Sequence, residues 1–143
     1  MIIDHVRLLA FANRMVAVGG SSPAEAAIVA DHLVEANLRG HDSHGVGMLV
    51  AYVRDLENGT LKANQAPEIV SDTGTISVWD ARAGYGQVIA RQAVEWAIEG
   101  ARKHGVAVNG LRNAHHIGRV GAYGEIAARA GMVALHFVNV ASG

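Results

Sequence analysis

The sequence has no cysteine among its 143 residues. This absence excludes disulfide bonds, thiolate metal sites and a cysteine nucleophile, and it is compatible with a reducing compartment. The chain also lacks a block of lysine or arginine, and its net charge is -1. Because nucleic acids and anionic membrane surfaces are bound largely through clustered basic side chains, we expect neither as a partner.

Long apolar runs are absent as well. No segment approaches the roughly 18 consecutive apolar residues that a membrane span requires. Asp4 and Arg7 come too early in the chain for a secretory signal peptide. With 50% hydrophobic and 17% charged residues, the composition is that of an ordinary globular protein. We therefore expect a cytoplasmic protein.

The first 39 residues have the spacing of two helices. Asp4 is placed to cap a helix that runs to about residue 18, where Gly19-Gly20 ends it. Ser22-Pro23-Ala24-Glu25 has the pattern of a capping box, with proline at the first helical position. This box predicts a second helix that runs to Arg39.

A third helix is predicted after Gly40, with Asp42 or Ser43 as its cap. His44 would then lie in the first turn, where the positive end of the helix dipole attracts anions and disfavours an imidazolium. The predicted apolar stripe of this helix consists of Val46, Leu49, Val50, Val53 and Leu56.

From about residue 63 the pattern alternates between strands and helices. We expect strands at 68–71, 75–79, 106–111 and 132–140, and helices at 87–103 and 121–130. The predicted fold class is mixed α/β (α+β), with a helical segment over residues 1–62 and a partial α/β domain over residues 63–143. The chain stops directly after a strand that reads as buried, so we expect a fragment.

The stretch from Asn113 to Gly124 is the richest in chemically useful groups, and it lies between a predicted strand and a predicted helix. Ligands of α/β sheets bind at the carboxyl ends of strands, so this position favours function. His115 and His116 are adjacent, and their side chains must diverge. One of them facing a cleft would leave the other packed or solvated.

Three glycines of this stretch, Gly118, Gly121 and Gly124, are spaced G-x-x-G-x-x-G. Their backbone amides could face a phosphate or a carboxylate, or the glycines could serve turns and close helix packing. The spacing is not the G-x-G-x-x-G dinucleotide fingerprint, and the region about 20 residues on, Val138-Asn139-Val140, has no acidic residue. A Rossmann fold is therefore disfavoured.

Two readings of the histidines have little support. Asp42-Ser43-His44 holds the residue types of a hydrolase triad, but neighbours in sequence cannot align as that mechanism needs. His41 and His44, together with the pair at 115 and 116, could be zinc ligands, yet no H-E-x-x-H pattern accompanies them. We therefore expect no metal.

One reaction type suits these residues better. A histidine, with an unperturbed pKa of about 6.5, can give a proton to an oxygen, or take one, while hydride moves at the adjacent carbon. An arginine nearby would hold a carboxylate through two parallel hydrogen bonds. Arg119, Arg39 and Arg112 are the candidates for that contact.

Several ordered motifs together resemble the malate/L-lactate dehydrogenase family that lacks a Rossmann fold. They are Arg-Gly-His-Asp-Ser-His-Gly-Val at 39–46, Tyr52, residues 56–59, Gly-Tyr-Gly-Gln at 84–87 and Asn-Ala-His-His-Ile-Gly-Arg-Val-Gly at 113–121. The resemblance covers essentially the whole chain. It implies a homodimeric oxidoreductase that interconverts 2-hydroxy acids and 2-oxo acids with NAD or NADP as cofactor.

The resemblance also implies roles for residues. In some members the histidine matching His44 is the proton donor, with the serine matching Ser43 beside it as a relay; in another, the histidine matching His116 is the acid/base. Many members carry an arginine where this chain has Met48, so we expect Arg119 to bind the substrate carboxylate, with Arg39 as a second candidate.

The family's enzymes are more than twice as long as this chain, and most of their cofactor contacts lie beyond residue 143. The resemblance therefore implies an N-terminal portion that is inactive without a complementary segment. The alternative is a non-catalytic remnant or dimerisation module that keeps the helical front and has lost cofactor binding.

Overall fold

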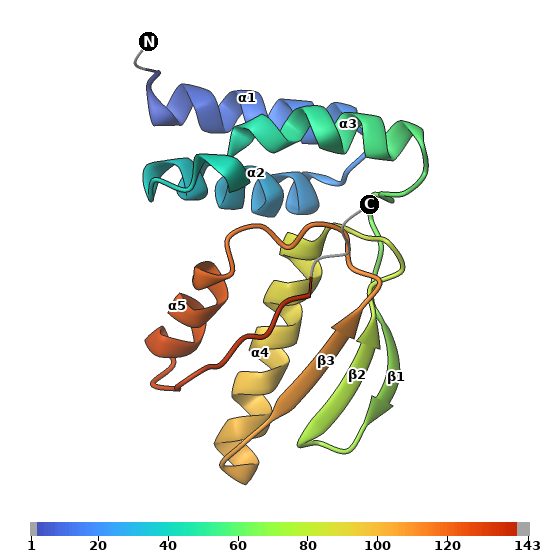
Figure 1. Cartoon of the computed structure of the whole chain (residues 1–143), viewed down its shortest axis with the longest axis vertical. Helices are drawn as coiled ribbons and strands as arrows, with labels where there is room; N and C mark the ends of the chain where they lie inside the picture. Colours follow the sequence, from blue (N-terminus) through green and yellow to red (C-terminus); the bar gives the residue numbers. More distant parts are fainter. Residues whose placement is uncertain (1–2, 140–143) are drawn as a thin grey trace.

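The computed structural model describes residues 3–139 and confirms the predicted mixed α/β fold. Figure 1 shows a layer formed by the first helices of the chain, which lies across one end of a part that contains a small sheet and the later helices. In chain order the elements are α1 (His5–Val18), α2 (Pro23–Leu38), the 3-10 turns η1 (Asp42–His44) and η2 (Val46–Met48), α3 (Leu49–Glu57), β1 (Glu68–Asp72), β2 (Ile76–Asp80), α4 (Gly86–His104), β3 (Val108–Arg112) and α5 (Gly121–Arg129).

Both predicted caps of the first two helices are confirmed. The Asp4 carboxylate accepts hydrogen bonds from two backbone amides of the first turn of α1, each at 3.1 Å. The Ser22 hydroxyl accepts from the Glu25 amide at 3.3 Å. Glu25 does not close the capping box, however. Its two carboxylate oxygens accept hydrogen bonds from the backbone amide of Asn64 at 2.8 and 3.0 Å. The side-chain oxygen of Asn64 in turn accepts a hydrogen bond from the Ser22 amide at 2.7 Å. The chain after α3 is thereby fastened to the start of α2.

The third helix differs from its prediction. It begins at Leu49 without a side-chain cap, because residues 42–48 form two 3-10 turns instead. His44 therefore lies at the end of a separate turn, and the helix-dipole argument does not apply to it. The helix is also rotated from the predicted face: Tyr52 is 1% exposed, whereas Val50 is 79% exposed.

The sheet has the order β1-β2-β3. β1 and β2 form the predicted antiparallel hairpin, while β2 and β3 run parallel and are connected through α4. Asp80 pairs with Arg112 at the carboxyl ends of the two parallel strands, so both strands lead into loops at the same edge. Trp79 packs with Ile89 and Ala93 of α4, which covers one face of the sheet.

The helical layer and the α/β part share a core. Tyr85 and Val88, from the start of α4, belong to the same buried cluster as Leu33 of α2 and Tyr52 of α3. This shared core fixes the end of α4 beneath the three helices. The division into domains at residues 62 and 63 stays a prediction.

The predicted strand at 132–140 is wrong over residues 132–139, which are extended but pair with no strand in the described structure; Val140 lies outside the described residues. Val133, Leu135 and Phe137 alternate as in a strand, yet their side chains are 97%, 80% and 93% exposed. A strand needs a neighbour for its backbone hydrogen bonds, and here none is provided. Over residues 3–139, no helix combines the length and the apolar character that a membrane crossing requires.

Candidate active site

Ser43 and His44 are presented by a tight turn that is clamped to α2. The side chain of Asn37 donates to the Asp42 carboxylate at 2.6 Å and accepts from the Val46 amide at 2.9 Å. Gly45 lies directly against it, since a Cβ there would come within 2.3 Å of the Asn37 oxygen. The turn thus keeps one position on the helical layer.

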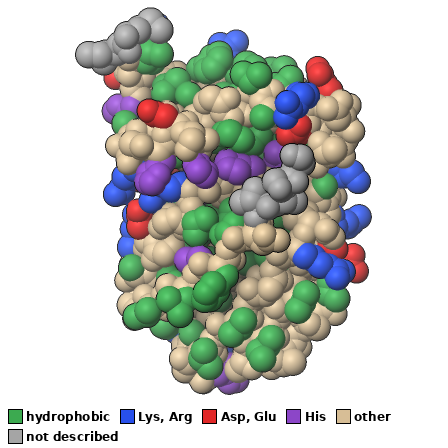
Figure 2. All heavy atoms as spheres, viewed as in Figure 1, with side chains coloured by type: hydrophobic (Ala, Val, Ile, Leu, Met, Phe, Trp, Pro, Cys, Tyr) green, Lys and Arg blue, Asp and Glu red, His purple; other side chains and the backbone are tan. Residues whose placement is uncertain are grey.

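The hydroxyl of Ser43 lies 2.9 Å from Nδ1 of His44. The ring of His44 faces that of His116 at 5.3 Å between ring centroids, with 32° between the planes. The fold thereby brings together His44 and His116, two of the three predicted catalytic residues, from segments far apart in sequence. The third, Ser43, is hydrogen-bonded to His44. Figure 2 shows histidine side chains gathered in a band where the helical layer meets the α/β part.

His115 and His116 reach this boundary because their backbone crosses the start of α4 at very close range. A Cβ on Gly86 would lie 2.2 Å from the carbonyl oxygen of His115 and 2.7 Å from that of His116. The His115 amide also donates to the Gly84 carbonyl at 3.1 Å. Only glycine at position 86 allows the His115–His116 backbone to approach α4 this closely.

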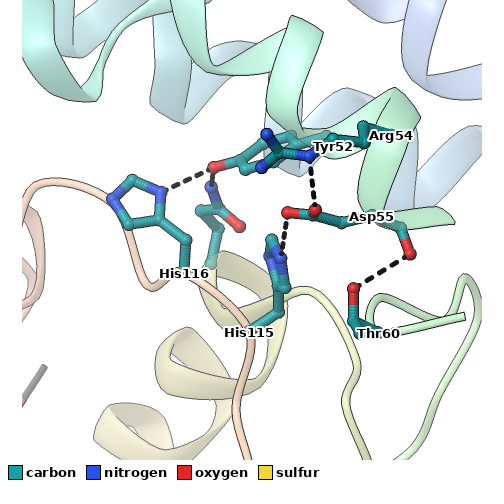
Figure 3. Close-up of polar contacts among 7 residues, drawn as sticks. Tyr52, Arg54, Asp55, Thr60, His115 and His116 are labelled. Atoms are coloured by element: carbon teal, nitrogen blue, oxygen red, sulfur yellow. Dashed lines mark hydrogen bonds and ion pairs between the residues drawn. The ribbon is translucent and has the colours of Figure 1, made fainter. Parts of the chain in front are cut away.

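The two adjacent histidines diverge as expected, and both contact α3 (Figure 3). Nε2 of His115 lies 3.0 Å from the Asp55 carboxylate, and Nδ1 of His116 lies 2.8 Å from the Tyr52 hydroxyl. Burial by itself would raise the pKa of Asp55, but hydrogen bonds from His115 and Arg54 hold it below its usual value. His115 is thus a link between loop and helix.

His116 is backed by buried polar groups. Gln87, the second residue of α4, is 1% exposed and donates its amide to the Tyr52 hydroxyl. Burial lowers the pKa of His116 to about 4, with smaller contributions from the charges of His44 and His115. His116 is therefore neutral at neutral pH. The sequence carried a signal for this network, since Tyr52 and Gln87 both lie in the motifs of the family resemblance, but it assigned them no role.

His32 of α2 is a residue that sequence reasoning missed. Its Nε2 accepts the backbone amide of Arg119 at 2.8 Å, and its ring packs against Tyr123. Burial, followed by the charge of Arg119, lowers the pKa of His32 to about 4. Gly118 has φ +71, and a Cβ there would lie 2.3 Å from the His32 ring. The loop carrying Arg119 is thereby fixed to the helical layer.

The two arginines predicted to bind substrate converge on Glu125, which the sequence analysis did not single out. Nη1 of Arg119 lies 2.9 Å from one oxygen of Glu125, and Nη2 of Arg39 lies 3.5 Å from the other. The Arg119 hydrogen bond is the main reason that the pKa of Glu125 lies below its usual value. Arg39 is exposed and also pairs with Glu35 at 2.8 Å.

Arg119 itself is 9% exposed, and its Nε and Nη2 are buried without a hydrogen-bond partner in the described structure. These two nitrogens form one edge of the guanidinium, the edge that binds a carboxylate bidentately. The third candidate, Arg112, binds Asp80 at 3.1 Å beside the sheet.

A polar hollow of about 490 Å³ lies at the carboxyl ends of β2 and β3. It touches the histidine cluster only through His115, because neither His44 nor His116 lines it. His44 and His116 therefore lie outside the lining of this hollow. Within residues 3–139, no group of three or more His, Asp or Glu side chains is arranged to hold a metal ion.

The three glycines of the 113–124 stretch differ in their roles. Gly118 has the backbone and the close contact that require glycine, and a Cβ on Gly121 would meet the Arg119 side chain at 2.8 Å. A Cβ on Gly124 would have 4.0 Å to its nearest neighbour. The turn and packing interpretation thus applies to the first two glycines.

Comparison with known proteins places this geometry in a family. The family described as malate/L-lactate dehydrogenase matches residues 3–142. The chain is 48% identical over 121 residues to hydroxycarboxylate dehydrogenase B from Escherichia coli O157:H7, which covers 85% of this chain and 34% of that protein. It is 42% identical over 112 residues to L-lactate dehydrogenase from Cupriavidus necator, covering 78% of this chain and 32% of that protein.

Among solved structures, malate dehydrogenase from Pyrococcus horikoshii OT3 superposes with a TM-score of 0.88 at 32% identity, covering 92% of this chain and 38% of that one. The chain spans about a third of the length of the curated relatives it matches. Because the family matches nearly every residue and the fold agrees with that of a solved member, this chain belongs to the malate/L-lactate dehydrogenase family.

Proposed function

We propose that this chain carries the proton-transferring and carboxylate-binding groups of an NAD- or NADP-dependent oxidoreductase that interconverts 2-hydroxycarboxylates and 2-oxocarboxylates. The supporting observation is the meeting of His44 and His116, 5.3 Å apart between ring centroids, on two segments that the fold clamps independently. Relatives named for hydroxycarboxylate, lactate and malate substrates agree with this reaction class.

The reaction requires a proton at the oxygen whose carbon gains or loses hydride. A histidine whose Nδ1 is hydrogen-bonded to a neighbour can use Nε2 for that proton. Ser43 makes this contact with His44. We assign His44 as proton donor and acceptor, Ser43 as the group that orients its ring, and His116 as a second group facing the same oxygen.

The substrate carboxylate needs a cation, and Arg119 is the proposed one. Its unpaired Nε and Nη2 edge has the geometry for a bidentate carboxylate, and leaving that edge without a partner is costly in a buried site. In the structure this edge is closed off from solvent, and Glu125 holds the other side of the guanidinium. Substrate binding would therefore require this segment to open. Arg39 adds positive charge from the exposed side of Glu125.

The described residues suit the acid–base half of this chemistry but do not form a dinucleotide cradle. The amides near the start of α5 are already used, since Arg119 donates to His32, Ala122 to the Arg119 carbonyl and Tyr123 to the Val120 carbonyl. A nicotinamide nucleotide would exchange the hydride, and we propose that residues outside this chain bind most of it. The choice between NAD and NADP is open.

The test uses a completed chain, made by joining residues 1–143 to the part of E. coli hydroxycarboxylate dehydrogenase B that lies beyond the match. We expect it to oxidise NADH or NADPH in the presence of 2-oxo acids, and His44→Ala to reduce kcat by about 10² to 10⁴. A folded completed chain that binds NADH yet reduces no 2-oxo acid would contradict the proposal.

The alternative is a non-catalytic dimerisation module. It is favoured by the apolar side chains that the helical layer leaves in solvent, such as Val6, Phe11 and Val50, at 60%, 55% and 79% exposure. Fluorescence titration of the completed chain with NADH and NADPH separates the two, because only the enzyme should bind a nucleotide. The homodimer and the cytoplasmic location remain predictions.

A further inference from the structure

His116 is held from behind by two buried side chains on two different helices. Tyr52 of α3 and Gln87 of α4 are each 1% exposed. The Gln87 amide nitrogen donates to the Tyr52 hydroxyl, which lies 2.8 Å from Nδ1 of His116 (Figure 3). The three groups form a chain of hydrogen bonds that ends on the imidazole.

Counting donors shows which group donates in each of these hydrogen bonds. A phenol has one proton, and here its oxygen already accepts the amide hydrogen of Gln87. The Tyr52 hydroxyl must therefore donate its own proton to Nδ1 of His116. A neutral imidazole that accepts at Nδ1 carries its proton on Nε2.

Reversing the Gln87 amide would reverse this argument, but the surroundings oppose it. The Gln87 carbonyl oxygen is buried and has no partner in the described structure. A reversed amide would put its two N–H groups in that position. Buried N–H groups without a partner are rarer than carbonyls without one, so the orientation with the nitrogen toward Tyr52 is preferred.

The hydrogen bonds from Gln87 through Tyr52 to His116 hold their protons in place and do not relay them. Burial raises the pKa of Tyr52 above its usual value, so the phenol keeps its proton. Nε2 of His116 points away from Tyr52 in Figure 3, and it has no hydrogen-bond partner among residues 3–139. The free corner of the ring is thus an N–H group that points away from the Tyr52 hydroxyl, on a ring whose centroid lies 5.3 Å from that of His44.

We propose that Tyr52 and Gln87 are positioning residues that fix His116 as the neutral Nε2–H tautomer, so that His116 donates a hydrogen bond to the substrate oxygen while His44 transfers the proton. This inference rests on the proposed function and assigns different roles to its two histidines. A neutral imidazole polarises a carbonyl but gives up its proton far less readily than an imidazolium.

The step balances in the direction of reduction. The hydride gained by the carbonyl carbon would be supplied, with its two electrons, by a reduced nicotinamide nucleotide. The carbonyl oxygen gains the proton of the His44 imidazolium and becomes a hydroxyl, and His44 becomes neutral until solvent reprotonates it. The N–H of His116 stays intact throughout.

The tautomer can be measured on the 143-residue chain itself, without turnover. Long-range ¹H–¹⁵N correlation spectra of histidine-labelled protein, with His116 assigned through His116→Gln, report which ring nitrogen carries the proton. We expect Nε2–H over Nδ1–H by about ten to one, the bias of a single hydrogen bond. Tyr52→Phe should bring the two forms toward equality and raise the proton affinity of His116 by about tenfold. Tyr85→Phe, which removes a buried hydroxyl outside the chain of hydrogen bonds, should change neither.

An Nδ1–H tautomer in the unmodified chain would overturn the proposal, as would a folded Tyr52→Phe variant whose His116 is unchanged. Should Tyr52→Phe fail to fold, the unmodified chain still decides the matter. A slowly exchanging Tyr52 hydroxyl proton with a cross-peak to Nδ1 of His116 supports the proposal, and a hydroxyl proton without that cross-peak rejects it.

The division of labour is tested in the completed chain. His116→Gln replaces the imidazole by a neutral N–H donor that cannot transfer a proton, so it should keep kcat within about tenfold, whereas His116→Ala should lose more. His44→Gln should lose about 10² to 10⁴. Equal losses for His116→Gln and His44→Gln would reject the assignment. Failure of all completed chains to turn over would reject the proposed function and leave the tautomer result standing.

Discussion

Burial of imidazole rings sets the chemistry of single residues in this site. His32 and His116 both have a pKa lowered to about 4 from an ordinary value of 6.5, in each case mainly by burial. His32 accepts a hydrogen bond from the Arg119 amide, and we propose that His116 likewise accepts one from the Tyr52 hydroxyl. Protonating either ring would oppose an existing hydrogen bond.

Stability should therefore fall in mild acid. Unfolded histidine binds a proton near pH 6.5, and these folded rings bind one only near pH 4, so the unfolded state binds more protons between the two values. The free energy of unfolding is expected to decrease as the pH falls from 6.5 to 4, by about 1–2 kcal/mol per ring after allowing for solvent screening. Urea unfolding of the chain and of His32→Gln across this range measures it. If the free energy of unfolding of His32→Gln depended on pH as steeply as that of the unmodified chain, His32 would not be a source of the acid sensitivity.

Arg119 is the residue on which substrate affinity should depend. In the completed chain, Arg119→Met should raise KM for a 2-oxo acid by about 10- to 100-fold, because a charge-assisted bidentate contact is lost. The control is Arg129→Met, which removes another arginine that pairs with Glu125. The Arg129 side chain is 73% exposed, and its Nη2 lies 3.7 Å from the Glu125 carboxylate. An unchanged KM for Arg119→Met would show that another group holds the carboxylate.

At the scale of elements, the site depends on how closely a loop can approach a helix. The start of α4 has glycine where the His115–His116 backbone crosses it, and the turn bearing Ser43 and His44 has Gly45 where Asn37 reaches in. Both histidine segments are thus positioned by backbone contacts to neighbouring helices. A small change in either helix would move the ring it supports.

Gly86→Ala tests this dependence. A Cβ would overlap the His115 carbonyl, so the loop must shift, and we expect a loss of about 1–3 kcal/mol in the free energy of unfolding together with altered His116 resonances. Gly124→Ala is the matched helical control, because the space there is open and alanine is the better helix former. Equal stability of the two variants would be inconsistent with the crossing described here.

At the scale of the whole molecule, the described residues bring the proposed acid–base histidines together, while the amides near the start of α5 are already hydrogen-bonded. The chain spans about a third of its curated relatives, and its exposed apolar side chains include Val133, Leu135 and Phe137 at the end of the described segment. The site residues sit at the boundary between the helical layer and the α/β part. In the function proposed above, the nucleotide would be bound mostly by residues other than those described here.

The isolated 143-residue chain should show no NAD(P)H-dependent reduction of 2-oxo acids, since the amides near its glycines are already hydrogen-bonded within the chain. Loss of NADH absorbance with saturating substrate measures this, and the completed chain serves as the positive control. Robust turnover by the isolated chain would overturn the expectation.

The sequence by itself determined the local features. Helix starts at Asp4 and Ser22, the hairpin before α4 and the mixed fold class all follow from short-range signals, which depend on residues close in sequence. The motifs around Ser43, His44 and His116 were also visible, because the functional group that each residue carries is given by the sequence alone.

Only the tertiary structure decided which groups meet. Asn64 displaced the capping-box partner of Glu25, Tyr52 turned inward in place of Val50, and residues 132–139 found no strand to pair with. Glu125 and Gln87 gained their roles from contacts with residues distant in sequence. Spacing along the chain cannot encode such contacts, because burial and hydrogen-bond competition are settled by what packs alongside.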